Sequence, residues 1–486
     1  MKRKKINHPL RLQVKVEADQ KQSQLSNFSD GVMIMMGVID ILRHKLRAII
    51  FALACVFCFS ASAEITTYTA HGGPIKGLAM SEDQQYLIST SFDYSAVIWQ
   101  ANDMTEMAVI NDHEAAVNIG SFSPDGKWLA TGGDDHLILL WNFEQLINDA
   151  ENAEPIRLEG HMGKVVHLNF SEDSQYLASA SWDGKIGIWP IANLSDKRFI
   201  NGHRGPVNAV QFSDDGSHLY SAGYDGHLRY WDLDGDIFIR SLVRNGWGVN
   251  IFRVFEDKNQ LYYGTVDGAI KLVSLDTRQE LVTVAGERDP VLSLYWSPSK
   301  GQIAFGNSKG RVVILDAETG EVEKDFVVIN GPSWGLVMMP DQKTLMVAGL
   351  DDYLTAWEID TEEVTLTDAN YQNRRFHPTG EMSNGERQFA RKCSVCHTLI
   401  ADDKRRAGPT LYGVFGRKAG SVEGYSYSDA LLTSDIIWDE DTINALFRDG
   451  PDQVTPGTKM PIQRMKNDQD RQDLITFLKT MTTTDN

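Results

Sequence analysis

The stretch Asp183-Gly-Lys-Ile-Gly-Ile-Trp189 begins with a turn dipeptide, continues as an alternating apolar run and ends in tryptophan. A turn that leads into such alternation predicts a strand of a β-hairpin. The pattern returns along the chain, in full or weakened, with its last residue at positions 99, 141, 189, 231, 273, 315 and 357. Successive spacings of 42, 48, 42, 42, 42 and 42 residues are typical of four-stranded repeats. The sequence therefore predicts seven such units over residues 64–360.

The first four units share a stricter spacing. A histidine lies 22 residues before the aspartate of the turn, and a serine or threonine lies four before it. The histidine–aspartate pairs are His71 and Asp93, His113 and Asp135, His161 and Asp183, and His203 and Asp225. This pattern resembles the WD-repeat family, which implies a seven-bladed all-β propeller with a buried His–Ser/Thr–Asp–Trp network in each blade. We interpret these histidines as structural rather than as metal ligands or acid–base groups, because a buried imidazole needs both nitrogens satisfied.

Units five to seven lack this histidine and carry Asn245, Glu287 and Ile329 in its place. We expect apolar packing alone to hold these blades. Residues 64–68 precede the first histidine without a unit of their own. They are predicted to form the outer strand of the last blade, which would close the ring and leave no open sheet edge.

A different signal follows residues 361–382, which read as a polar linker. The string Cys393-Ser-Val-Cys396-His397 has the spacing of a c-type haem attachment motif, with two thiols for the porphyrin and an imidazole for the iron. A redox dithiol and half of a zinc site are the competing interpretations. The first requires a βαβ context that the sequence does not predict, and the second requires two further soft ligands.

Residues 383–486 resemble class I cytochromes c, an all-α family of electron carriers. The resemblance rests on Gly385–His397, Ala407–Gly420, Gly424–Ala430, Trp438, Pro456–Met460 and the final Asp473–Lys479 segment. It implies one covalently bound haem c, with its iron held by His397 and Met460 and its thioethers formed by Cys393 and Cys396. It further implies that Pro409 orients His397, that Arg417, Tyr427 and Trp438 surround the propionates, and that Phe389 and Phe477 pack where the first and last helices cross.

Two methionines compete with Met460 for the iron, and one position departs from the family. Met465 lacks the preceding Pro-Gly turn, and Met481 lies at the far end of the last predicted helix. Leu446 occupies a position where the family usually has a tyrosine, so the reduction potential is expected to differ from that of typical members.

The charge distribution limits the choice of partners. Residues 64–382 hold 23 Lys and Arg against 47 Asp and Glu, which argues against nucleic acid as a ligand. Basic residues from Arg391 to Lys459 surround the haem motif, so we expect redox partner proteins and docking of the acidic propeller on the cytochrome domain.

The N-terminal region predicts export. Residues 36–63 contain a basic flank, an apolar core and the ending Ala61-Ser-Ala63, which together indicate a signal peptide. Met33, Met35 and Met36 are alternative starts, which leaves open a spurious extension over residues 1–35. The apolar run is short for a membrane span, so no stable span is expected after cleavage, with an uncleaved anchor as the alternative.

The sequence thus predicts a periplasmic electron carrier, with the propeller as a protein-docking scaffold. Nothing in the propeller indicates a catalytic constellation. The competing hypothesis is a redox enzyme whose propeller binds a substrate or second cofactor and whose cytochrome domain drains the electrons.

Overall fold

The computed structural model describes residues 66–69, 71–235, 237–359, 382–401, 406–425, 427–458, 460 and 462–482. The expected extension and signal peptide lie outside these ranges, as does the expected linker apart from Met382. Among the described helices, none has the length and apolar character required to cross a bilayer.

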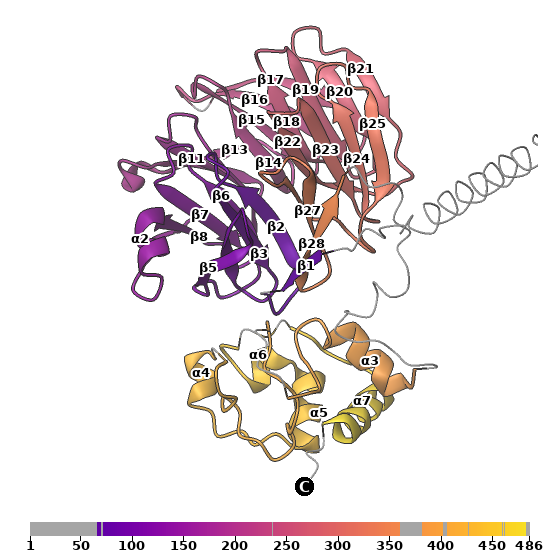
Figure 1. The fold of residues 1–486 in the computed structure, drawn as a ribbon. Coiled ribbons are helices and arrows are strands. Elements are labelled where there is room, and N and C mark those ends of the chain that lie inside the picture. The colour runs from indigo at the N-terminus through magenta and orange to yellow at the C-terminus, as the bar shows by residue number, and fades with distance from the viewer. Residues whose placement is uncertain are drawn as a thin grey trace, which may run out of the picture. The chain divides into compact units, whose positions relative to one another are not determined.

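The N-terminal part consists of seven antiparallel sheets of four strands each, arranged as blades (Figure 1). Blades one and two contain β2 (Ile75–Met80), β3 (Tyr86–Ser91), β4 (Ala96–Gln100), β5 (Thr105–Ile110), β6 (Val117–Phe122), β7 (Trp128–Gly133), β8 (Ile138–Asn142) and β9 (Ile156–Leu158). Blades three and four contain β10 (Val165–Phe170), β11 (Tyr176–Ser181), β12 (Lys185–Pro190), β13 (Arg198–Asn201), β14 (Val207–Phe212), β15 (His218–Gly223), β16 (His227–Asp232) and β17 (Ile237–Arg244).

The last three blades follow in the same order. They contain β18 (Val249–Phe255), β19 (Gln260–Thr265), β20 (Ile270–Ser274), β21 (Glu280–Val284), β22 (Val291–Ser297), β23 (Gln302–Asn307), β24 (Arg311–Asp316), β25 (Val322–Val327), β26 (Gly335–Met338), β27 (Thr344–Ala348) and β28 (Tyr353–Glu358). The remaining strand, β1 (Thr66–Thr69), completes the seventh sheet. The prediction of a seven-bladed propeller is confirmed.

The one irregular spacing has a local cause. Between β8 and β9 the chain forms helix α2 (Phe143–Asn148), which is six residues long and begins with Asn142 accepting a hydrogen bond from Gln145 N–H. Phe143 and Leu146 of this helix are buried. The helix lengthens the second repeat without disturbing the strands on either side.

The ring closes through β1. This strand pairs antiparallel with β28, with Thr66 opposite Ala356 and Thr69 opposite Tyr353. The predicted closure is therefore confirmed, and its register begins at Thr66 within the described residues.

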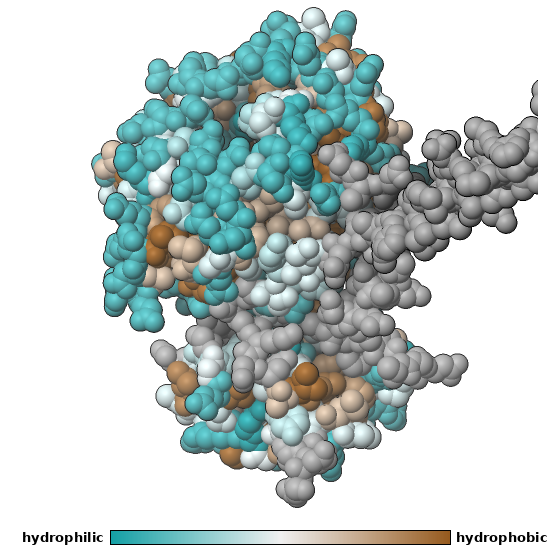
Figure 2. Space-filling model, viewed as in Figure 1, coloured by the Kyte–Doolittle hydropathy of each residue, from teal (hydrophilic) through white to brown (hydrophobic). Residues whose placement is uncertain are grey.

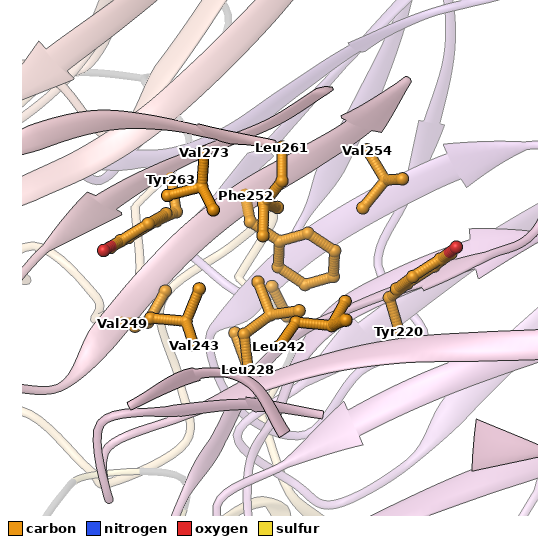
Figure 3. Packing of buried hydrophobic residues seen from close by; sticks show 12 residues of the cluster. Tyr220, Leu228, Leu242, Val243, Val249, Phe252, Val254, Leu261, Tyr263 and Val273 are labelled. Carbon is orange, nitrogen blue, oxygen red and sulfur yellow. The ribbon is translucent and has the colours of Figure 1, made fainter. Parts of the chain in front are cut away.

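Apolar side chains fill the seams between neighbouring blades. Figure 3 shows the seam between blades four and five, where Leu228 and Leu242 face Phe252 and Leu261. Equivalent clusters occupy the other six seams, including the one between blades seven and one. Most of the visible outer surface of the propeller is hydrophilic (Figure 2). Each blade is thus stabilised mainly by burial against its two neighbours.

The histidine network is present and can be followed in blade three. Trp189 donates its indole N–H to Ser179 Oγ at 2.9 Å, Ser179 lies 2.8 Å from His161 Nε2, and His161 Nδ1 lies 2.9 Å from Asp183. Burial opposes ionisation of Asp183, but hydrogen bonds from His161 and two backbone N–H groups hold its pKa well below its ordinary value. A depressed carboxyl pKa stabilises the fold above the unfolded pKa, and this stabilisation is lost only as the pH falls through the folded value.

Blades one and four repeat this chain of hydrogen bonds, and blade two breaks it. His113 contacts Asp135 at 2.8 Å and Thr131 at 2.9 Å, but the buried indole nitrogen of Trp141 has no hydrogen-bond partner among the described residues. The expected four-member network is therefore incomplete in this blade.

Blades five and six are not held by apolar packing alone, so that expectation was wrong in part. In blade five, Thr265 donates its hydroxyl to Asp267 at 2.5 Å. In blade six, Asn307 Oδ1 accepts the N–H groups of Lys309 and Arg311. Short polar side chains therefore secure the turns even where the histidine is missing.

The C-terminal part is helical. It contains α3 (Asn384–Lys392), α4 (Asp429–Leu432), α5 (Glu440–Asp449), α6 (Pro451–Val454) and α7 (Asp468–Met481). A core that includes Phe389, Ile443 and Leu474 lies between these helices.

His161→Ala tests the structural role of the histidines. We expect it to lower the free energy of unfolding of the propeller by about 1–3 kcal/mol, because Asp183 and Ser179 lose a buried partner. Asn245→Ala is the matched control, since it changes the equivalent position of blade five, where no such network exists, and should have little effect. The measurement is thermal unfolding followed by circular dichroism. Unchanged melting combined with the loss of a bound metal would show that His161 is a ligand instead.

Candidate haem-binding site

The attachment motif sits on a tight turn at the end of α3. Ser383 caps the start of this helix by accepting a hydrogen bond from Glu386 N–H. At the other end, the N–H groups of Cys396 and His397 both donate to the carbonyl of Cys393, at 3.0 and 2.8 Å. The turn brings both sulfurs and the imidazole to one wall of a cavity in the helical domain.

The thiols do not have the environment of a redox dithiol. Cys393 is buried, and its burial together with the nearby Cys396 raises the pKa of its thiol to about 12. A reactive dithiol requires a lowered thiol pKa instead. The described residues also contain no group of three or more His, Cys, Asp or Glu side chains arranged to hold a metal ion. The structure thus favours neither of the two competing interpretations of the motif.

His397 is oriented by the backbone. Its Nδ1 lies 2.7 Å from the carbonyl oxygen of Pro409, which accepts the ring N–H and leaves Nε2 as the free ligand atom. Burial lowers the pKa of this histidine, which favours the neutral ring. Gly408 lies against the ring, and a Cβ at this position would be 2.4 Å from His397 Cε1. The glycine is therefore required by close approach to the imidazole.

Met460 also lines the cavity. Met460 follows a turn in which Gly457 has a φ of +79°. The N–H of Met460 donates to Thr458 Oγ1 at 3.1 Å. Met465 is packed in the core and Met481 is about half exposed. Neither of these two lines the cavity, so of the three methionines weighed from the sequence only Met460 reaches it.

The polar residues expected near the propionates gather around the same cavity. Arg417 donates to the carbonyls of Tyr412 and Thr410, at 2.8 and 2.6 Å, which fixes its guanidinium. Tyr427 Oη accepts a hydrogen bond from Val422 N–H at 3.4 Å. All the residues expected from the sequence line this cavity: Cys393, Cys396, His397, Pro409, Arg417, Tyr427, Trp438 and Met460.

The cavity lining also contains residues that were not predicted from the sequence, among them Ser428 and Tyr425. Ser428 has a buried hydroxyl with no hydrogen-bond partner among the described residues, and Tyr425 donates its hydroxyl to the carbonyl of Ala407 at 2.7 Å. Both lie in the Gly424–Ala430 stretch that the sequence had singled out. An unsatisfied buried hydroxyl in a cavity wall needs a polar partner from the ligand, which a propionate would supply. The residues present therefore fit a haem group.

The close crossing of helices α3 and α7 requires a glycine at position 385. A Cβ on Gly385 of α3 would lie 2.0 Å from the carbonyl oxygen of Asp473 in α7. Phe389 and Phe477 pack beside this contact, with ring centroids 5.7 Å apart (Figure 1 shows the two helices). Leu446, at the position where the family usually has a tyrosine, is buried and lines the cavity.

Comparison with known proteins agrees with both halves of the chain. The WD domain, G-beta repeat model matches residues 62–100, 104–142, 154–190 and 195–232, and the Cytochrome c model matches residues 382–482. The four repeat matches correspond to the four units that carry the histidine. The fold and the site thus define a WD-repeat propeller joined to a haem-binding electron-transfer domain.

Similar proteins identify the family of the C-terminal domain. The chain is 44% identical over 103 residues to cytochrome c of Stellaria longipes and 45% identical over 100 residues to cytochrome c of Arabidopsis thaliana. These alignments cover 94% and 88% of the relatives but 21% of this chain. Through its C-terminal domain the chain belongs to the cytochrome c family, which implies a haem c with iron and a role in electron transfer.

Gly408→Ala tests the cradle of His397. The added methyl would overlap the imidazole, so we expect a loss of about 1–3 kcal/mol in stability of the cytochrome domain and poorer haem incorporation. Gly416→Ala is the control, because a Cβ there meets nothing within 4 Å although the φ is +85°. The measurement is the ratio of haem absorbance to protein absorbance, together with the melting temperature. Gly408 itself does not have a positive φ, so an effect of Gly408→Ala no larger than that of Gly416→Ala would contradict the role of its contact with His397.

Proposed function

We propose that the protein is an exported c-type cytochrome that transfers single electrons through one haem, with the propeller as a docking scaffold for partner proteins. The haem would be attached to Cys393 and Cys396 and ligated by His397 and Met460. The observation that carries the proposal is the convergence of the Cys-x-x-Cys-His turn and Met460 on one cavity.

The residues that line the cavity would each have a distinct role in holding the haem. When bound, the haem supplies a one-electron couple, and a His/Met ligand pair favours a high reduction potential. Pro409 holds the tautomer and orientation of His397, while the Gly457 turn presents the Met460 thioether. The apolar side chains of Leu411, Val414 and Leu446 exclude water from the cavity. A rigid, dry site of this kind keeps the reorganisation that accompanies a change of charge small.

Location and partners are part of the proposal. Export to the periplasm rests on the signal-like segment 36–63, which is outside the described residues. Redox partners would meet the basic side chains at the cavity, among them Lys392, Arg417 and Lys418, which favour an acidic partner. Docking between the acidic propeller and the cytochrome domain stays a prediction from their charges.

Met460→Ala tests the ligand assignment. We expect the weak red absorption band of the ferric protein to disappear and the reduction potential to fall, because thioether ligation favours the ferrous state. Met465→Ala is the matched control. Since Met465 is buried, it should lower stability by about 2–5 kcal/mol while the band persists.

The reverse result would contradict the assignment. If the band persists in Met460→Ala and disappears in Met465→Ala, the sixth ligand is Met465. A pyridine haemochrome assay on the purified full chain counts the haems, and a value other than one per chain would contradict the single-haem proposal.

A further inference from the structure

Four large apolar side chains are exposed on the loops and turns of blades three to five. Met162 is 79% exposed, Trp182 51%, Tyr224 63% and Trp247 61%. Trp182 and Tyr224 each directly precede the aspartate of their hydrogen-bond network, and Met162 directly follows His161. These positions place all of them at the end of the blades where the histidine loops and the aspartate turns meet.

Backbone contacts show that these turns and loops are continuous. A Cβ on Gly184 would lie 3.3 Å from the carbonyl of Gly205, so the turn after Trp182 touches the loop that enters blade four. A Cβ on Gly226 would lie 2.9 Å from the carbonyl of Trp247, so the turn after Tyr224 touches the loop that enters blade five. The exposed aromatic side chains therefore occupy one uninterrupted sector of the ring.

Arginine side chains lie in the same sector. Arg204 is exposed in the loop between β13 and β14, which enters blade four, and Arg244 is exposed opposite His227 in the pairing of β16 with β17. Neither guanidinium forms an ion pair or a hydrogen bond within the part of the chain that the structure describes. Burial and the charges of Arg229, Arg244 and Arg204 lower the pKa of His227, against the opposing effect of Asp225. The positive charges of three guanidinium groups therefore act on the region around His227.

The aspartates of the neighbouring turns are engaged by groups other than the guanidinium groups of Arg204 and Arg244. Asp225 already accepts hydrogen bonds from His203, from Arg204 N–H and from Arg229. Asp183 is engaged in the same way by His161 and by Met162 N–H. The unpaired positive charge of Arg204 and Arg244 therefore faces solvent on a propeller that is otherwise strongly acidic.

We propose that Trp182, Arg204, Tyr224, Arg244 and Trp247, here named the arginine–aromatic patch, bind a short acidic segment of a partner protein. Exposed tryptophan, tyrosine and arginine are the residue types that contribute most to protein–protein binding. Two unpaired guanidinium groups match a pair of carboxylates. A long polyanion would extend beyond the patch onto the acidic remainder of the propeller, where it would be repelled.

This inference rests on the proposed scaffold role and adds the location of the docking surface and the chemistry of its partner. It does not depend on electron transfer, so the two can fail separately. Haem absorbance and reduction potential measured on the same samples report on the cytochrome domain alone.

The test uses the full-length haem-loaded protein and a fluorescently labelled peptide of alternating glutamate and phenylalanine, with fluorescence anisotropy as the readout. The double variant Arg204→Glu/Arg244→Glu and the single variant Trp247→Ala should each weaken binding by about tenfold or more. Added salt should weaken binding to the unaltered protein. Arg157→Glu/Lys343→Glu is the matched control, because it makes the same change in net charge at two exposed residues outside the patch and should leave binding unchanged.

Several results would overturn the proposal. They are no binding of the glutamate peptide at low salt, equal binding of a peptide with lysine in place of glutamate, or an equal loss in the control variant. Tighter binding of a single-stranded oligonucleotide of the same charge would assign the patch to a nucleic acid instead. A dimer of the unaltered protein in sedimentation that Arg204→Glu/Arg244→Glu abolishes would assign it to a second copy of this chain.

Discussion

The pairing of β1 with β28 is the constraint on which the propeller depends. Blades one to six are each built from four consecutive strands, so each could form locally, whereas the seventh needs a strand from the opposite end of the repeat region. Without Thr66–Thr69, the last blade would expose an unpaired edge. The seam between blades seven and one also needs both ends of the chain, because its core joins Ile75 and Val97 to Val337 and Leu354. Closure therefore turns seven weak modules into one cooperative unit.

The propeller could be predicted because its repeats keep an almost constant spacing along the sequence. A four-stranded module that stacks on copies of itself must keep its period, and so a 42-residue spacing persists in blades five to seven after the histidine has been lost. Other features do not follow from periodicity. Asn118, Asn208 and Asn250 each donate a side-chain hydrogen bond to a backbone carbonyl of the next blade. The recurring Val-Asn pair was visible in the sequence, but the partner of its amide was not. The unsatisfied indole of Trp141 depends on side-chain geometry that no spacing encodes.

The haem site was predictable for a different reason. The spacing of Cys393, Cys396 and His397 is the one that covalent haem attachment requires, and the Pro-Gly turn before Met460 is typical of a segment that presents a ligand. The cavity residues missed from the sequence, Ser428 and Tyr425, have no such signature, because a serine or tyrosine in a loop usually faces water. Their place in the cavity wall became visible only in the structure, where Ser428 has a buried hydroxyl without a partner among the described residues and Tyr425 bonds to the backbone of Ala407. Sequence patterns thus reveal groups whose spacing is set by chemistry, and structure reveals groups whose function is set by burial.

Charge connects the two halves in function without requiring any particular arrangement between them. An acidic propeller repels other acidic proteins over most of its surface, so a positive sector on it gains selectivity from the repulsion elsewhere. The cytochrome domain also presents basic side chains, in its case at the cavity that would hold the haem. Acidic partner segments are therefore attracted to two separate surfaces of the same chain, the arginine–aromatic patch and the basic edge of the cavity. A protein with only one basic surface would have to use the same site both to hold a partner and to exchange electrons. Separating these tasks lets docking be strong while the encounter at the haem stays brief enough for turnover.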